Sequence, residues 1–319
     1  MTIKAVTTEM KAKAFRFVVG SLFFASFFAS ASASAQVRNY VASTGLDINP
    51  CSRTAPCRTF QAAVNVVQPG GEVVALDSTE YGPIHITKAV SVVAAPGIQA
   101  AVTVTSGNGL TINAGPSDIV TLRGLTITGV GGSAGVYFNA GRALSIESCL
   151  ISGFSGFPTN TEYGVFFAGG GDLAVTDSSV RHNDIGVLVM PAAGNAFAAL
   201  DHVRIEDGIG GLVVRDGSKV SVRDSVASAN LVGLNAASST TPVELTVDNC
   251  MVSNNSADGI SASSPSGASV TVRVSSSTVT DNSTGLANHG GALLLSRDSN
   301  TVEGNSNNTL GVIGSYPAK

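Results

Sequence analysis

One pattern recurs in LSIESCLISGF (residues 144–154), LAVTDSSVRHN (173–183), VSVRDSVASAN (220–230), LTVDNCMVSNN (245–255) and VRVSSSTVTDN (272–282). In each block apolar and polar residues alternate, a small residue follows, and the block ends at a turn. Alternation with a period of two is typical of β-strands that bury one face. The blocks therefore predict short strands that are repeated along the chain.

A glycine followed by an aliphatic residue recurs between these blocks. The pairs are Gly109-Leu110, Gly135-Val136, Gly164-Val165, Gly186-Val187, Gly211-Leu212, Gly233-Leu234, Gly259-Ile260, Gly285-Leu286 and Gly311-Val312. Steps of 22 to 29 residues are too short for a repeating pair of helices, so each unit is read as two or three strands. Leucine-rich repeats are the alternative, but they need a strict leucine pattern, whereas Val, Ile, Ser and Cys interchange here.

These strands have no partner within their own unit. Each must pair with the same strand of the next unit, which gives parallel sheets with strands about 4.8 Å apart. Parallel connections are overwhelmingly right-handed. We therefore predict an all-β fold, a right-handed parallel β-helix (solenoid).

Superposing the units predicts three columns of equivalent residues. Two of them point inward. The first inward column is Leu125, Cys149, Ser178, Val203, Ser225, Cys250 and Ser277. The second inward column is Ile127, Ile151, Val180, Ile205, Ala227, Val252 and Val279. The third, just before the Gly-aliphatic pair, is Asn183, Asp207, Asn230, Asn255 and Asn282. Asn tolerates the left-handed backbone of a tight turn, and stacked amides can hydrogen-bond along the axis. We predict an asparagine ladder at Asn183, Asn230, Asn255 and Asn282 rather than separate solvated turns.

Residues 1–35 are typical of a signal peptide. Four basic residues precede an apolar run over 17–29, and Ala33-Ser34-Ala35 matches the A-x-A cleavage pattern. A membrane anchor is the alternative, but the run is too short to cross about 30 Å of hydrocarbon. We expect cleavage near Ala35, a secreted or periplasmic protein, and no membrane span after signal removal. The rest is expected to be one domain, with a cap and first coils over 36–100 and repeats over 101–319.

Without its first 35 residues the chain has 14 basic and 21 acidic residues, a net charge of −7. It has no Trp and no basic cluster, so it would repel a phosphate backbone and lacks platforms for base stacking. Nucleic acid is therefore not expected as a partner.

The segment before the repeats predicts a short capping helix. Thr59 is the expected N-cap, Phe60, Ala63, Val64 and Val67 share one helical face, and Pro69-Gly70-Gly71 ends the helix. A helix at this position would cover the open end of the first coil.

The segments YVASTGLDINPCSRTAPCRTFQAAV (40–64), PGGEVVAL (69–76) and YGPIHITKAVSVVAAPG (81–97), followed by the coils, resemble the pectin-lyase-like superfamily of right-handed parallel β-helix proteins. The likeness covers nearly all of the chain after residue 35. It implies the fold and a carbohydrate ligand. It does not imply one activity, because this superfamily includes lyases, hydrolases, esterases, epimerases and adhesins.

Four cysteines fit an exported protein. Cys51 and Cys57 could close a small loop beside the capping helix, and an oxidising compartment favours a disulfide over free thiols or a metal site. Cys149 and Cys250 share an inward column four coils apart, about 19 Å, so we expect them to be buried thiols.

The catalytic residues of this superfamily are not matched. The resemblance implies outward Asp residues for Ca²⁺ with an Arg or Lys base in lyases, or paired Asp residues with Gly-His-Gly and Arg-Ile-Lys segments in hydrolases. Here the nearest segments are Asn288-His289-Gly290-Gly291 and Arg204-Ile205-Glu206. We therefore assign no catalytic residue to this chain from the resemblance.

The coil register itself places one cluster of mixed charge on the outer surface. Its members are Asp177, Asp201, His202, Arg204, Arg223 and Asp224. In one interpretation His202 lies between two carboxylates and could act in general acid–base catalysis. In the alternative interpretation the cluster is a solvated ladder of salt bridges. Asp177, Asp201, Asp224 and Asp248 could hold a Ca²⁺, and no other cofactor is expected.

Two functional hypotheses remain. In the first, a noncatalytic solenoid binds a polysaccharide or a cell-surface glycan, with Phe154, Phe157 and Tyr163 of the longest loop either stacking on sugar rings or packing that loop onto the coil. In the second, the protein is a polysaccharide lyase or glycoside hydrolase. The missing catalytic sets favour the first hypothesis, as do short turns that leave little material for a cleft.

Overall fold

The computed structural model describes residues 37–156 and 161–317, so the expected signal peptide over 1–35 lies outside the described residues. Residues Gln36–Lys319 form one compact unit. Within the described ranges the chain forms three parallel sheets and a single short helix. This confirms the predicted all-β parallel β-helix with a short N-terminal helix.

Each coil between the first and the last contributes one strand to each sheet, in the order A, B, C. Sheet A contains β1 (Arg38–Val41), β2 (Gly71–Ala75), β5 (Val90–Ala94), β8 (Ile119–Arg123), β11 (Ala143–Glu147), β14 (Gly171–Thr176), β17 (Ala196–Asp201), β20 (Ser218–Arg223), β23 (Val243–Asp248), β26 (Val270–Ser275), β29 (Leu293–Ser296) and β32 (Ile313–Ser315). Sheet B contains β3 (Thr79–Glu80), β6 (Ala100–Val104), β9 (Leu125–Gly129), β12 (Leu150–Ser152), β15 (Ser179–Arg181), β18 (Arg204–Glu206), β21 (Val226–Ser228), β24 (Met251–Ser253), β27 (Thr278–Thr280) and β30 (Thr301–Val302). Sheet C contains β4 (Ile84–Ile86), β7 (Asn108–Asn113), β10 (Ala134–Ala140), β13 (Tyr163–Phe167), β16 (Ile185–Val189), β19 (Gly210–Val214), β22 (Val232–Ala237), β25 (Asp258–Ser263), β28 (Thr284–Asn288) and β31 (Asn307–Leu310).

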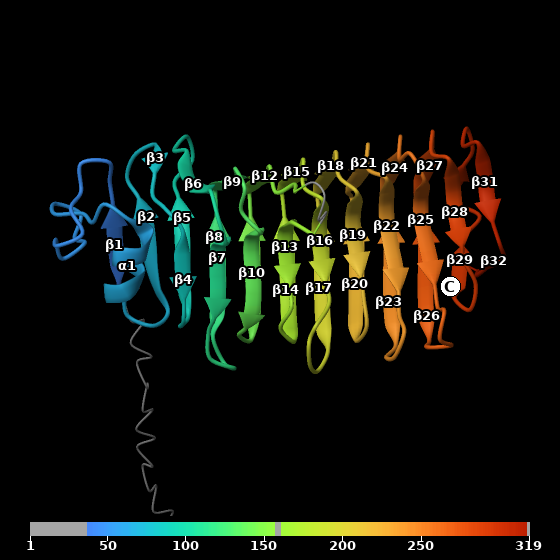
Figure 1. Cartoon of the computed structure of the whole chain (residues 1–319), viewed down its shortest axis with the longest axis horizontal. Helices are drawn as coiled ribbons and strands as arrows, with labels where there is room; N and C mark the ends of the chain where they lie inside the picture. The colour runs from blue at the N-terminus through green and yellow to red at the C-terminus, as the bar shows by residue number, and fades with distance from the viewer. Residues whose placement is uncertain (1–36, 157–160, 318–319) are drawn as a thin grey trace, which may run out of the picture. The chain divides into compact units, whose positions relative to one another are not determined.

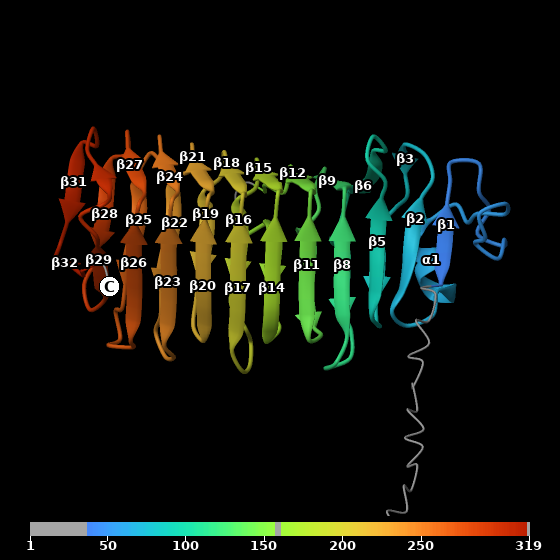
Figure 2. The same cartoon turned by 180° about the vertical axis from the view of Figure 1, so that it is seen from behind.

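Figures 1 and 2 show the strands of successive coils side by side, in sequence order from β1 to β32. The register keeps equivalent residues together, so Ile151 pairs with Ile127 on one side and Val180 on the other. Members of both inward columns are at most 5% exposed. Each buried Val or Ile contributes about 1.5–3 kcal/mol, which makes these columns a main source of stability.

The serines of the first inward column are paired although they are buried. The Ser178 hydroxyl donates to the Thr176 carbonyl over 2.7 Å and accepts from the Cys149 backbone N–H over 3.1 Å. Ser225 and Ser277 make equivalent bonds two and four coils later. A hydroxyl therefore fits the same inward position as an aliphatic group or a thiol, because the turn supplies its partners.

Most of the repeated coils turn at residues with a left-handed backbone. Between sheets A and B they are Ser148, Asp177, His202, Asp224, Asn249 and Ser276, and between sheets B and C they are His182, Asp207, Ala229, Asn254 and Asp281. The expectation that the ladder asparagines themselves take this conformation was wrong. The residue before each of them does, and this leaves the amide directed into the coil.

The asparagine column is buried and hydrogen-bonded from coil to coil. The Nδ2 group of Asn230 donates to Oδ1 of Asn255 over 3.2 Å, Asn255 donates to Asn282 over 2.8 Å, and Asn282 donates to Asn305 over 2.9 Å. Asn305 was not anticipated from the sequence. Asn183 is also buried, and its amide bonds to the backbone of Phe154 and Ile151.

Asp207 does not belong to this column, contrary to the sequence alignment. It is one of the left-handed turn residues, and its exposed carboxylate lies 3.5 Å from His182. Gly208 takes the ladder position, since its N–H donates to the Asn230 side chain. A Cβ there would lie 2.5 Å from the Asn183 carbonyl oxygen, so no side chain fits in that coil.

The repeated glycines are needed for space rather than for backbone freedom. A Cβ on Gly233 would lie 2.6 Å from the Gly259 carbonyl oxygen, 2.9 Å from Asn255 Nδ2 and 3.0 Å from Val252. The last pair of the series, Gly311-Val312, was assigned wrongly. Thr309 pairs with Leu286, so the Asn308-Thr309 pair occupies that register position.

The N-terminal end of the unit is covered as expected. Helix α1 (Phe60–Val66) begins after Thr59, whose side chain accepts from the Ala62 N–H over 3.2 Å. Both views place α1 beside β1 and β2 (Figures 1 and 2). Cys51 and Cys57 form a disulfide with Cα atoms 4.6 Å apart. Their loop hydrogen-bonds to Tyr40 and so covers the free edge of β1.

No helix in the described part of the chain is long and apolar enough to cross a membrane.

Candidate functional site

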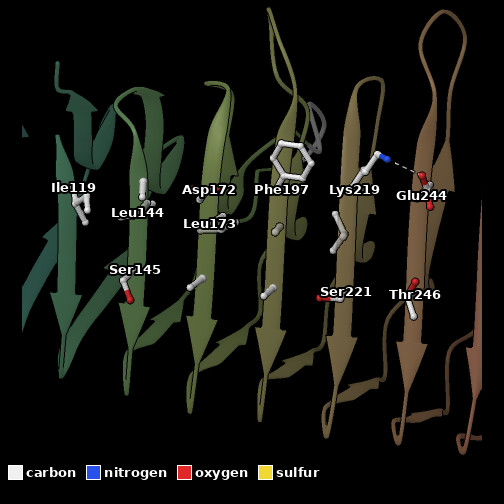
Figure 3. A pocket seen from close by; sticks show the side chains of 15 residues that line it. Ile119, Leu144, Ser145, Asp172, Leu173, Phe197, Lys219, Ser221, Glu244 and Thr246 are labelled. Carbon is white, nitrogen blue, oxygen red and sulfur yellow. Dashed lines mark ion pairs between the residues drawn. The ribbon is translucent and has the colours of Figure 1, made fainter. Parts of the chain in front are cut away.

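A groove of about 590 Å³ runs across the outer face of sheet A (Figure 3). Its floor is a register column of small residues, Ser145, Ala174, Ala199, Ser221 and Thr246. These residues come from five successive coils, so the floor extends over about 19 Å along the axis. Small side chains allow a ligand to approach the sheet closely.

The first rim of the groove is the outward column two residues before the floor. It contains Ile119, Ala143, Asp172, Phe197, Lys219 and Glu244. Figure 3 shows the Phe197 ring between Asp172 and Lys219, with Lys219 directed toward Glu244. Phe197 is 48% exposed and Ile119 is 46% exposed, so this rim offers apolar surface to a ligand.

The outward column two residues after the floor lies just beyond the residues that line the groove, and we call it the second rim. It contains Arg123, Glu147, Thr176, Asp201, Arg223 and Asp248. The Arg123 guanidinium lies 2.7 Å from Glu147, and that of Arg223 lies 2.7 Å from Asp201. On the first rim Lys219 lies 2.9 Å from Glu244, which Arg273 also approaches to 3.1 Å.

These ion pairs keep the rim carboxylates ionised. Hydrogen bonds from Lys219 and then Arg273 lower the pKa of Glu244, and the bond from Arg223 lowers the pKa of Asp201. Burial alone would raise the pKa of Glu147, but hydrogen bonds from Arg123 and Ser145 lower it overall. A carboxylate held in this way is a poor proton donor near neutral pH, so these three groups suit binding better than acid catalysis.

The cluster predicted from the coil register lies at the edge of the second rim. His202 Nδ1 is 2.8 Å from an Asp201 oxygen, and Arg223 contacts Asp201 and, at 3.9 Å, Asp224. Asp177, His202 and Asp224 do share one column, at the left-handed turn. Arg204 pairs with Glu206 and lines a separate shallow hollow together with Asp177 and His202. The structure therefore brings together part of the predicted cluster, as an exposed network of ion pairs.

Three possible metal ligands meet in this cluster. Ligand atoms of Asp201, His202 and Asp224 all lie within 4.8 Å of one another. Arg223 already supplies a positive charge to both carboxylates, and a divalent ion would have to displace it. Of the four carboxylates proposed for Ca²⁺, Asp201 and Asp224 belong to this group, and Asp248 accepts from the Ser275 hydroxyl over 2.6 Å.

The three aromatic residues considered for stacking on sugars differ in their burial and position. Phe154 is completely buried and packs against Gly129 and Gly135, which agrees with the packing alternative and leaves no ring surface for a sugar. Phe157 lies outside the described residues. Tyr163 is half-buried and its ring packs 4.8 Å from that of Phe166.

Sequence reasoning missed the groove and Phe197. The signal was present, because the outward positions two residues after Asp172, Phe197 and Lys219 are all small. We expected no cleft because the turns between strands are short, and we assumed that the walls of a cleft are built from long loops. Here the walls are larger side chains on the same strands as the floor.

The fold is that of several solved carbohydrate-active proteins. The chain superposes on the pectate lyase Pel9A with a TM-score of 0.65 and 17% identity, over 89% of this chain and 79% of that one. It superposes on an alginate lyase from Paenibacillus sp. str. FPU-7 with a TM-score of 0.59 and 13% identity, over 87% of this chain and 99% of that one. It superposes on XylC in complex with xylose with a TM-score of 0.53 and 8% identity, over 88% of this chain and 70% of that one.

Identities this low show a shared fold alone. No curated protein matches this chain. The family model described as right handed beta helix region matches residues 108–307, which cover both rims and the floor of the groove from Ile119 to Glu244. The chain therefore belongs to the right-handed β-helix family.

Proposed function

We propose that this protein binds a glycan in the groove on sheet A and does not cleave it. The observation that carries the proposal is the combination of a small-residue floor, five coils long, with the exposed ring of Phe197 beside it. Sugar rings have apolar faces that stack on aromatic side chains, and their hydroxyl groups bond to residues such as Ser145 and Ser221. The groove floor extends along the axis over five coils, which suits a chain rather than a single sugar.

The shared fold supports a carbohydrate ligand, since pectate lyase and alginate lyase use the same architecture. The rim chemistry supports binding without cleavage. Cleavage by a lyase needs a positioned base and a cationic group for the developing enolate, whereas each groove cation is already paired with a carboxylate.

The binding test uses a panel of soluble polysaccharides, affinity electrophoresis and calorimetry. Phe197→Ala removes the half-exposed ring and should weaken binding at least about tenfold, which corresponds to about 1.4 kcal/mol. Met251→Ala is the matched control, because Met251 is 50% exposed but lies on sheet B. Equal binding by Phe197→Ala and wild type would contradict the groove as the site.

The cleavage test follows reducing ends and unsaturated products, with and without Ca²⁺. We expect neither product. Turnover that disappears in His202→Ala would contradict the noncatalytic proposal and would identify the Asp201–His202–Asp224 cluster as an active site.

We further propose that the protein is exported, with residues 1–35 acting as a cleaved signal. The disulfide between Cys51 and Cys57 supports this, because disulfides persist in oxidising compartments. Expression of the full chain followed by N-terminal sequencing of the periplasmic and secreted fractions tests it. A product that stays in the cytosol with Met1 intact would refute export.

A further inference from the structure

We infer that the glycan recognised by the sheet A groove is uncharged rather than a uronic-acid polymer. This inference rests on the proposed function and names its ligand class. The carrying observation is the charge state of the two rims, together with the apolar surface between them.

Each cation of the two rims, and Arg273 next to them, is already paired with a carboxylate. Arg123, Arg223, Lys219 and Arg273 lie 2.7 to 3.1 Å from carboxylate oxygens of Glu147, Asp201 and Glu244. A uronate that approaches one of these cations competes with its present partner. The displaced carboxylate would then repel the ligand from a position a few ångströms away.

The rims also carry a surplus of acid. Asp172 on the first rim and Asp248 on the second have no ion-pair partner within the described residues. The two rims and Arg273 together hold five carboxylates and four cations. A polyuronate would add one negative charge for every sugar. Near a protein surface two like charges 4 Å apart cost about 4 kcal/mol, so this repulsion outweighs a typical sugar hydrogen bond.

An uncharged glycan meets none of this repulsion. Phe197 and Ile119 are each about half exposed, and the floor between the rims is made of Ala, Ser and Thr side chains. The apolar face of a neutral pyranose can lie on this surface without desolvating a charge. Ser145, Ser221 and Thr246 then offer hydroxyl partners to its edge.

The test compares the full protein with neutral polysaccharides (mannan, xylan and mixed-linkage β-glucan) and with polygalacturonate and alginate of matched length. At least one neutral glycan should bind at least about tenfold more tightly than either polyuronate. Its Kd should change less than about threefold between low salt and roughly 1 M NaCl, because no charges attract it. Phe197→Ala should weaken this binding, and Met251→Ala should not.

A charge reversal gives an independent readout. Asp172→Lys places an unpaired cation on the first rim and should create binding to polygalacturonate that salt abolishes. Glu303→Lys changes the net charge equally on the last coils, outside the groove, and should not. Tighter binding of a polyuronate by wild type, with or without Ca²⁺, would overturn the inference but leave glycan binding intact. Failure to bind any glycan would refute both.

Discussion

Replacing Asn255 with alanine tests the asparagine ladder where it is most completely bonded. Asn255 is 1% exposed. Its Oδ1 accepts from the backbone N–H and the Nδ2 group of Asn230, over 3.1 and 3.2 Å. Its Nδ2 group donates to the Ala227 carbonyl over 3.2 Å and to Asn282 over 2.8 Å. One side chain therefore joins three coils.

The expected loss follows from the groups left without partners. In Asn255→Ala the Asn230 backbone N–H and the Ala227 carbonyl lose the bonds that Asn255 supplies. The Asn230 amide keeps Ile205 and Ser228 as acceptors, so it does not add to the cost. The Ala227 carbonyl keeps its place in the parallel ladder between β21 and β24, so one buried unsatisfied group predicts a loss of about 1–3 kcal/mol in the free energy of unfolding.

Urea unfolding followed by circular dichroism measures this loss, and hydrogen exchange at the Asn230 amide locates it. Asn254→Ala is the control, because Asn254 is the exposed neighbour and alanine already occupies the equivalent left-handed position at Ala229. The control should cost less than about 1 kcal/mol. If Asn255→Ala costs no more than Asn254→Ala, the ladder does not stabilise the coils as argued.

Further predictions concern the thiols, the repeat glycines and one buried acid. Reducing the Cys51–Cys57 disulfide should lower the free energy of unfolding by about 2 kcal/mol, as compared by urea unfolding with and without reductant. Burial raises the pKa of both Cys149 and Cys250 to about 11, so a thiol reagent at pH 8 should label neither in the native protein and both in denaturant; rapid native labelling would show that the core opens. Gly233→Ala should destabilise the fold by more than about 2 kcal/mol because backbone surrounds the added methyl group, whereas Gly267→Ala, where nothing lies within 4 Å, should cost only its backbone strain; equal losses in urea unfolding would argue against a steric role. Burial and a hydrogen bond with Glu162 raise the pKa of Asp184, so its stabilising effect is fully present below 3.8 and is lost as pH rises through the raised value; Asp184→Asn should flatten that part of the stability profile, and an unchanged profile would contradict the assignment.

Much of the fold could be predicted from the sequence because its signals are local or periodic. The inward columns, such as Ile151 with Val180, follow from alternation and a repeated spacing. The capping helix after Thr59 follows from one turn of helical periodicity. Errors arose where two adjacent residues compete for one role. Asp207 and Gly208 could both align with asparagine, and only the close approach of the Asn183 carbonyl shows which one lies in the column.

The sequence by itself determined that this chain repeats, buries alternate residues and must stack its strands on those of neighbouring coils, since a strand of five residues has no other way to satisfy its backbone. Only the tertiary structure decided what lies on the outer face. The groove floor joins residues such as Ser145, Ala199 and Thr246, which come from different coils. Steps of unequal length separate these coils, and the ion pairs of the rims depend on side-chain conformation. A ligand site made of side chains from five coils therefore appears only when the register places them in one column.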